Sequence, residues 1–128
     1  MTTCEILKDT KTVAVVGISG NPIKTSRMIA DYLIDKGYKV VGVNPTKPEI
    51  DGIEVYEKLT DIPFQVDLVD VFRRSEAIPE IIPDVLEIKP KYLWLQLGIK
   101  NDEAVKPAID ANIVTVQNKC VKIELANC

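Results

Sequence analysis

Residues 12–24 read Thr-Val-Ala-Val-Val-Gly-Ile-Ser-Gly-Asn-Pro-Ile-Lys, an apolar β-branched run that ends in a glycine-containing loop. The run Thr12–Val16 lacks the polar–apolar alternation of a half-exposed strand, which is typical of a strand buried on both faces of a parallel sheet. Apolar residues then recur at helical spacing from Ser26 onward, and Gly37 is a suitable C-terminal stop. A strand, a loop and a helix in this order predict the beginning of an α/β fold.

Four further strands and two further helices are predicted along the chain. The strands follow from short apolar runs at Val40–Val43, Val66–Phe72, Tyr92–Leu95 and Ile113–Val116. One helix is expected to be capped by Ser75 and kinked by Pro79 and Pro83, and the other begins at the capping residue Asn101. A short element over Ile53–Tyr56 has no assigned type, and the pattern of Lys119–Leu125 fits either a helix or a strand.

Strands that alternate with helices predict a Rossmann-like, doubly wound, three-layer α/β fold. Right-handed crossovers give an open parallel sheet of five strands. With the strands numbered along the chain, we expect their order across the sheet to be 3-2-1-4-5. The length of 128 residues fits a single domain over residues 1–128. Ligands of such sheets bind at the carboxyl ends of the strands, near the point where the strand order reverses.

Composition and charge exclude several classes of protein. Apolar residues make up 46% and charged residues 27% of the chain, which is the balance of an ordinary globular domain. The apolar runs are too short to span a membrane, and residues 1–5 lack the pattern of a signal peptide, so we expect a cytoplasmic location. The net charge is −3 and the basic residues are dispersed, which argues against a nucleic-acid partner.

The chain contains no histidine, and this limits its chemistry. A Ser-His-Asp triad, a Cys-His pair, a histidine metal site and a phosphohistidine are all impossible within it. The three cysteines, Cys4, Cys120 and Cys128, are odd in number and lack metal-ligand spacing. We therefore expect a reduced protein without a metal site, in which Cys4 and Cys128 have no particular role.

The loop after the first strand has the features of a phosphate site. Gly17 allows a tight turn, and the N-terminus of the next helix presents unpaired N–H groups and a partial positive charge. Ser19, Thr25 and Ser26 add hydroxyl donors and Lys24 adds a full charge. Together these groups suit a pyrophosphate.

The second strand narrows the choice of nucleotide. An NAD site usually has an acidic residue at the end of this strand, whereas this chain has Asn44-Pro45. Lys47, just beyond, suits an additional phosphate. This residue pattern favours NADP or the 3′-phosphate of coenzyme A over NAD.

Five motifs occur in order along residues 10–125: Gly17–Pro22, Gly37-Tyr38 leading to Val43-Asn44-Pro45, Val69–Arg74, Trp94–Gly98 and Cys120–Glu124. Together they resemble the small stand-alone CoA-binding domain family, which is similar to the CoA-binding domain of the succinyl-CoA synthetase α subunit. The chain departs from the family pattern at Asn118-Lys119-Cys120, where the family commonly has Asp-Arg-Cys, and at Leu125, where it often has histidine.

The resemblance implies a site for coenzyme A across the strand ends. It places the pyrophosphate against Gly17, Ile18, Ser19, Lys24 and Ser26. It places the adenosine and its 3′-phosphate near Asn44, Pro45 and Lys47. Val71, Phe72 and Arg73 would pack on the adenine or the pantetheine arm, and Gln96 and Gly98 would line the path of the arm.

The resemblance predicts a protein that binds CoA or acyl-CoA and is not catalytic alone, because the residues form no evident catalytic constellation. Three alternatives stay open: an NAD(P)-binding oxidoreductase module, an acyl-CoA synthetase-like subunit that needs a partner, and a redox module in which Cys120 forms a mixed disulfide with the CoA thiol. Either a partner enzyme or a homo-oligomer fits the sequence.

Overall fold

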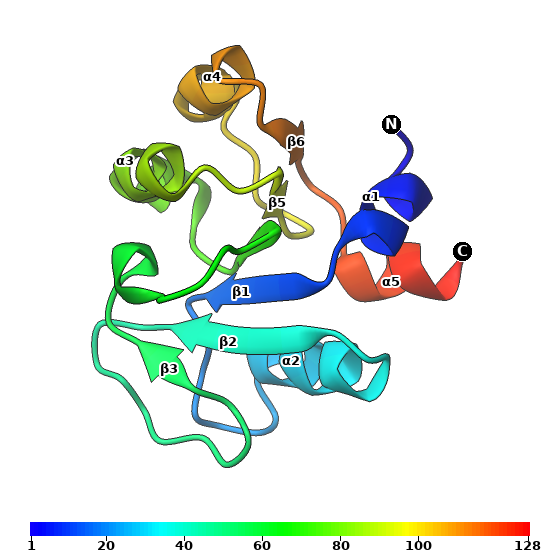
Figure 1. The fold of residues 1–128 in the computed structure, drawn as a ribbon, viewed down its shortest axis with the longest axis vertical. Coiled ribbons are helices and arrows are strands. Elements are labelled where there is room, and N and C mark those ends of the chain that lie inside the picture. Colours follow the sequence, from blue (N-terminus) through cyan, green and yellow to red (C-terminus); the bar gives the residue numbers. More distant parts are fainter.

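The sheet has six parallel strands in the order β3-β2-β1-β4-β5-β6 in the computed structural model, which describes residues 1–128 (Figure 1). The strands are β1 (Thr12–Val16), β2 (Lys39–Val43), β3 (Val55–Tyr56), β4 (Leu68–Val71), β5 (Tyr92–Leu95) and β6 (Val114–Val116). The helices are α1 (Thr3–Asp9), α2 (Thr25–Asp35), α3 (Ile78–Ile88), α4 (Asp102–Asp110) and α5 (Val121–Ala126). None of them combines the length and the apolar character that a membrane span requires.

The predicted three-layer parallel fold is confirmed, but the count of five strands is wrong. The short element of Val55–Tyr56 is a sixth strand, which pairs with β2 and forms that edge of the sheet. The predicted order holds only when this element is counted as the third strand. The strand predicted at Val66–Phe72 therefore lies beside β1, with Val16 opposite Val71, and not at the edge. A two-residue strand is too short to show a hydrophobic period, so the sequence pattern did not reveal it.

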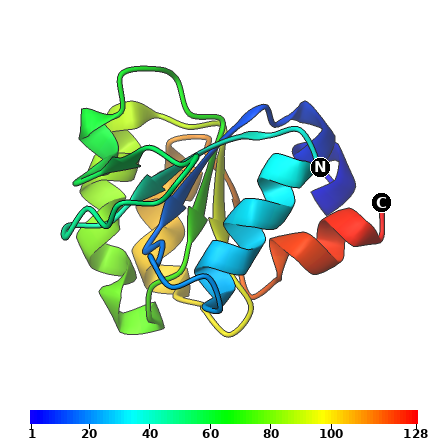
Figure 2. The ribbon, with the colours of Figure 1, turned by 90° about the horizontal axis from the view of Figure 1, so that it is seen from below.

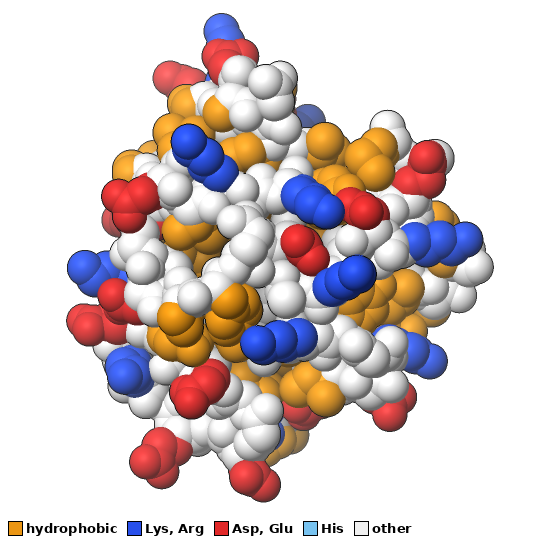
Figure 3. All heavy atoms as spheres, viewed as in Figure 1, with side chains coloured by type: hydrophobic (Ala, Val, Ile, Leu, Met, Phe, Trp, Pro, Cys, Tyr) orange, Lys and Arg blue, Asp and Glu red, His pale blue; other side chains and the backbone are white.

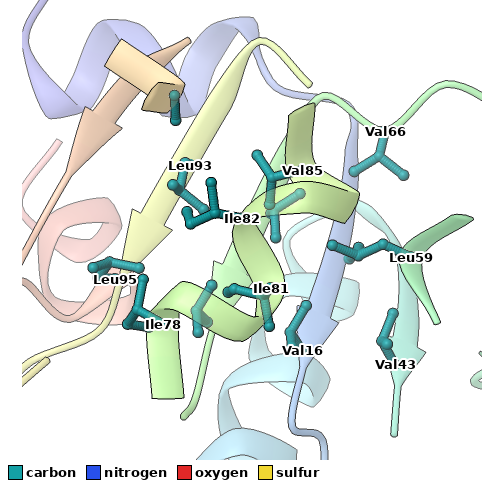
Figure 4. Close-up of a cluster of buried hydrophobic side chains, with 14 of the residues drawn as sticks. Val16, Val43, Leu59, Val66, Ile78, Ile81, Ile82, Val85, Leu93 and Leu95 are labelled. Atoms are coloured by element: carbon teal, nitrogen blue, oxygen red, sulfur yellow. The ribbon is translucent and has the colours of Figure 1, made fainter. Parts of the chain in front are cut away.

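The helices cover both faces of the sheet. Helices α1, α2 and α5 pack on one face and α3 and α4 on the other (Figure 2). Each face has its own core of buried aliphatic side chains. Figure 4 shows four residues of α3 directed toward the strands, Ile78, Ile81, Ile82 and Val85. They pack with Val16, Leu93 and Leu95, so α3 is fixed above β1, β4 and β5.

The two proline residues of α3 lie at positions that the helix accommodates. The helix begins at Ile78, so Pro79 is in the first turn, where the missing N–H has no helical partner to lose. Pro83 lies inside the helix, which nevertheless continues to Ile88. Ser75 does not cap α3, in contrast to the prediction. It forms a separate 3₁₀ turn, and its hydroxyl oxygen accepts a hydrogen bond from the Lys100 N–H at 3.0 Å.

The remaining helix predictions have clear outcomes. Asn101 caps α4 as expected, because its side-chain oxygen accepts the Ala104 N–H at 3.1 Å. The undecided tail forms α5. Helix α1 was not predicted, although it begins with a capping box in which Thr2 and Glu5 bond each other's N–H groups.

The expectation that Cys4 and Cys128 are reduced and without a role is wrong. The two residues form a disulfide with a Cα–Cα distance of 5.6 Å, and only Cys120 is free. The bond joins α1 to the residue that follows α5 by two positions, and these terminal helices lie side by side (Figures 1 and 2). A separation of 124 residues leaves no local pattern by which the pairing could be read from the sequence.

Candidate functional site

The strand order reverses between the neighbouring strands β1 and β4. From β1 the chain continues to β2 on one side of this point, and from β4 it continues to β5 on the other side. Two pockets flank this point. The β2-side pocket has a volume of about 540 Å³ and is lined among others by Gly17, Asn44 and Lys58. The β5-side pocket has a volume of about 670 Å³ and is lined among others by Gln96, Gly98 and Cys120. Phe72 and Arg73 line both pockets, so the two pockets adjoin at these residues, which we call the junction.

Gly17 directly follows β1 and lies against Phe72, which directly follows β4. Its φ angle is +87°, and a Cβ atom built on it would lie 2.5 Å from the carbonyl oxygen of Phe72. Its N–H donates to the carbonyl oxygen of Val43 at 2.8 Å, which fixes the start of the loop to β2. No other residue fits here without moving the backbone of β4.

The loop between β1 and α2 is folded by its own hydroxyl and amide side chains. The Ser26 hydroxyl oxygen accepts the Ser19 N–H at 3.0 Å, and the Ser19 oxygen accepts the Asn21 N–H at 3.0 Å. Helix α2 begins after Lys24, and no side chain caps it. No side-chain oxygen therefore accepts the N–H groups of its first turn. Thr25 lines the β5-side pocket beside the exposed Lys24. Of the predicted pyrophosphate residues, Gly17 lines the β2-side pocket, while Ile18, Ser19, Lys24 and Ser26 line neither pocket.

Two of the predicted site residues have their side chains in the core. Ile18 and Val71 are completely buried, each in one of the two hydrophobic clusters. The Ile18 side chain packs close to Gly42, while the Ile18 carbonyl oxygen accepts a hydrogen bond from the Asn44 side-chain amide at 2.9 Å. These two residues can offer only backbone atoms to a ligand.

The end of β2 contributes Asn44 and Pro45 to the β2-side pocket, but not Lys47. The Asn44 side chain shapes its loop, because its oxygen also accepts the Thr46 N–H at 2.9 Å. Lys47 is exposed, has a φ angle of +46° and lines a separate hollow that extends to Val55. Lys58, which the sequence analysis did not single out, supplies a cation to the β2-side pocket itself.

The β5-side pocket is bounded by the segments that follow β5 and β6. Gln96 is buried, and its side-chain oxygen accepts the Val121 N–H at 3.1 Å, which holds the start of α5. The Gly98 N–H donates to the Asn118 side-chain oxygen at 2.7 Å. Asn118, one of the positions that depart from the family pattern, thereby shapes the loop of Gly98. Cys120 is half-buried and faces this pocket together with Ile123.

The comparisons with known proteins agree with this geometry. A family model described as a CoA binding domain matches residues 11–126, nearly the whole chain. The chain belongs to the CoA-binding domain family. The resemblance inferred from the five sequence motifs is thereby confirmed.

Relatives of this CoA-binding domain occur both as short chains and inside longer ones. It is 36% identical over 119 residues to the uncharacterised protein YneT of Bacillus subtilis, covering 93% of this chain and 88% of that one. It is 30% identical over 86 residues to subunit alpha of the acetate–CoA ligase (ADP-forming) I of Pyrococcus furiosus, covering 62% of this chain. It spans only 19% of the length of that subunit.

Solved structures show the same fold. The cell-free ID.343 protein of Thermus thermophilus superposes with a TM-score of 0.93 at 34% identity, covering 99% of this chain and 98% of that chain. A dinucleotide-forming acetyl-coenzyme A synthetase 1 of Ca. Korarchaeum cryptofilum superposes with a TM-score of 0.71 at 26% identity. The match covers 82% of this chain and 25% of the synthetase chain.

The sequence patterns did not indicate several charged residues that line the β2-side pocket of the CoA-binding domain. Glu57 comes from the segment after β3, and Glu80 and Asp84 come from α3. Arg73 forms an ion pair with Glu80 at 3.2 Å. These residues lie in no recognisable motif, and only the docking of α3 on the sheet brings them to the pocket. On the face of the molecule seen in Figure 3, acidic and basic side chains are interspersed.

Asp70 is a completely buried carboxyl group in β4. It lies opposite Val15 of β1 and Trp94 of β5, and neither of its oxygens has a hydrogen-bond partner. Burial alone raises the pKa of Asp70 well above its ordinary value. Burial therefore favours the neutral form of the carboxyl group, since an unpaired buried carboxylate is strongly disfavoured.

This raised pKa predicts a pH-dependent stability. The folded chain keeps a proton on Asp70 that the unfolded chain releases above about pH 4, so stability is greatest below that pH and falls as pH rises through the folded pKa. The loss amounts to about 1.4 kcal/mol for each pH unit between the two pKa values. In urea unfolding between pH 4 and pH 7, Asp70→Asn is expected to gain stability steadily relative to the wild type. Parallel stability curves for the two proteins would contradict the assignment.

Proposed function

We propose that this domain binds coenzyme A or an acyl-CoA across the two pockets and is not catalytic alone. The observation that carries the proposal is the junction at Phe72 and Arg73, where two pockets meet beside the uncapped start of α2. An elongated ligand with a central pyrophosphate fits this arrangement. The adenosine would occupy the β2-side pocket, and the pantetheine arm the β5-side pocket.

The pyrophosphate is supported by charge and by backbone donors. The first turn of α2 offers N–H groups and the positive end of the helix dipole. Lys24 adds a full positive charge, and Arg73 adds one that is paired with Glu80 at 3.2 Å. Ser19 and Ser26 retain hydroxyl hydrogens that can be donated. Gly17 keeps the approach to the junction free of a side chain.

The two ends of the ligand meet different surroundings. Asn44, Pro45 and Lys58 offer polar groups and one cation to the adenosine, and the exposed Lys47 can reach toward a 3′-phosphate from the neighbouring loop. The β5-side pocket has a larger apolar share, with Phe72, Leu97 and Ile99 among its lining residues. Such a lining suits an uncharged, flexible arm.

A synthetase-like subunit is the second candidate, and the acetate–CoA ligase relatives favour it. This chain corresponds to a fraction of the ligase subunit and lacks histidine throughout. We infer that any acyl transfer would need groups supplied by a partner protein.

Replacing Lys24 tests the pyrophosphate position. Lys24→Ala removes one charge-assisted contact, and we expect CoA to bind about tenfold more weakly in calorimetric titration. Lys106→Ala, which removes an exposed lysine from α4 on the opposite face of the sheet, is the matched control and is expected to leave the affinity unchanged. Equal affinities for the two variants would remove Lys24 from the site.

A further inference from the structure

Helix α5 forms one wall of the β5-side pocket, through Cys120 at its start and Ile123 in its first turn. The helix has six residues, and Val121 is its only fully buried side chain. A helix of this length is not stable by itself, so its position depends on what holds its two ends. Helix α5 also packs on α2, where the Lys122 ammonium lies over the Tyr32 ring at 5.2 Å, so the attachment to α1 matters most for the far end of the helix.

The two ends of α5 are held in different ways. The start is bonded to the sheet, because Gln96 accepts the Val121 N–H and the Trp94 indole N–H donates to the Lys119 carbonyl oxygen at 2.8 Å. The far end is attached to α1, through a hydrogen bond from the Thr3 hydroxyl to Glu124 at 2.7 Å and through the disulfide of Cys128. If the disulfide is broken, the hydrogen bond between Thr3 and Glu124 remains as the polar attachment of this end to α1.

We propose that the Cys4–Cys128 disulfide is a redox-sensitive clasp, which holds α5 against the β5-side pocket and whose reduction loosens this wall and weakens binding of the pantetheine arm. Its binding consequence rests on the proposed function. Cys128 is exposed and Cys4 is half-buried, so a reductant can reach the bond. Exposed disulfides are the more readily reduced class, and a dithiol is the class of reductant that exchanges with them.

The reduction is a two-electron exchange with a dithiol. One thiolate of the dithiol attacks a sulfur of the Cys4–Cys128 bond and forms a mixed disulfide, and the other cysteine leaves as a thiolate. The second thiol of the dithiol then displaces the first cysteine. The two cysteines end as thiols, with the two protons that the dithiol gave up, and the dithiol ends as a disulfide.

Hydrogen exchange of the ligand-free protein tests the clasp directly. In low concentrations of urea we expect the amides of α5 to exchange at least several-fold faster after treatment with dithiothreitol, through a local opening that depends little on urea, whereas the amides of β1 and β4 exchange through global unfolding and follow the global stability. Cys4→Ser is expected to reproduce the fast exchange without reductant and to show no further response to it, which assigns the effect to this bond and not to Cys120. Unchanged exchange in α5, or exchange in α5 that depends on urea as steeply as exchange in β4, would overturn the proposal.

Titration with two ligands tests the binding consequence. Freeing the two wall side chains adds an ordering cost on binding, so CoA is expected to bind about two- to tenfold more weakly to the reduced protein. Adenosine 3′,5′-diphosphate, which has no arm, is expected to bind equally in both states. Equal weakening of both ligands would contradict the assignment of the effect to the arm. Absence of CoA binding in either state would contradict the proposed function, while the exchange experiment would still test the clasp.

Discussion

Reduction of the Cys4–Cys128 disulfide is expected to lower the free energy of unfolding by about 4–5 kcal/mol, because the bond closes a loop of more than 100 residues in the unfolded chain. For a domain of this size the loss corresponds to a fall in Tm of roughly 15–20 °C. Calorimetric melting with and without dithiothreitol measures it. The effect is large because the loop-closure entropy that a cross-link removes from the unfolded chain grows with the length of the loop.

Two variants separate this effect from other thiol chemistry. Cys128→Ser is expected to melt at the temperature of the reduced wild type and to be insensitive to dithiothreitol. Cys120→Ser keeps the disulfide and is expected to retain the full difference between its oxidised and reduced forms. A wild-type protein whose Tm does not respond to reductant would show that the two cysteines are not paired in solution.

Gly17→Ala is expected to cost both stability and ligand binding. The substitution combines a positive φ angle with a Cβ that overlaps the Phe72 carbonyl oxygen, so the backbones of β1 and β4 must separate at the junction of the pockets. We expect a loss of about 3 kcal/mol or more in urea unfolding. CoA affinity is expected to fall at least about tenfold, since the displaced loop no longer presents its donors at the pyrophosphate position.

Gly52→Ala is the matched control for this experiment. Gly52 has a φ angle of +80°, close to that of Gly17, but no atom lies within 4 Å of a Cβ built on it. The control therefore carries the backbone strain without the steric overlap, and we expect it to lose only about 1–2 kcal/mol and to keep its CoA affinity. Equal losses for the two variants would show that the close approach of Gly17 to Phe72 has no role.

The sequence predicted those parts of the fold that leave a pattern in consecutive residues. The unbroken apolar run of Thr12–Val16 reflects burial on both faces of the sheet, and the period of α3 was readable despite Pro79 and Pro83. The strand Val55–Tyr56 and the disulfide were not readable. The former is too short for a period, and the latter depends on two residues brought together only by the complete fold.

For the candidate site, the sequence predicted which loops come together but not how their side chains are directed. Position along the chain located the loops that meet at the junction, because the carboxyl ends of parallel strands share one edge of the sheet. It did not show that the side chains of Ile18 and Val71 turn into the core. It also missed Lys58 and Asp84, whose approach to the pocket depends on how the segments after β3 and β4 pack.

Parallel calorimetric titrations with CoA, NAD and NADP, after removal and mass-spectrometric identification of any copurified ligand, test the proposed ligand most directly. The two-pocket site and the family membership predict micromolar or tighter binding of CoA, with no comparable binding of either nicotinamide dinucleotide. Binding of NADP or NAD without binding of CoA would contradict the account and would favour the oxidoreductase module instead.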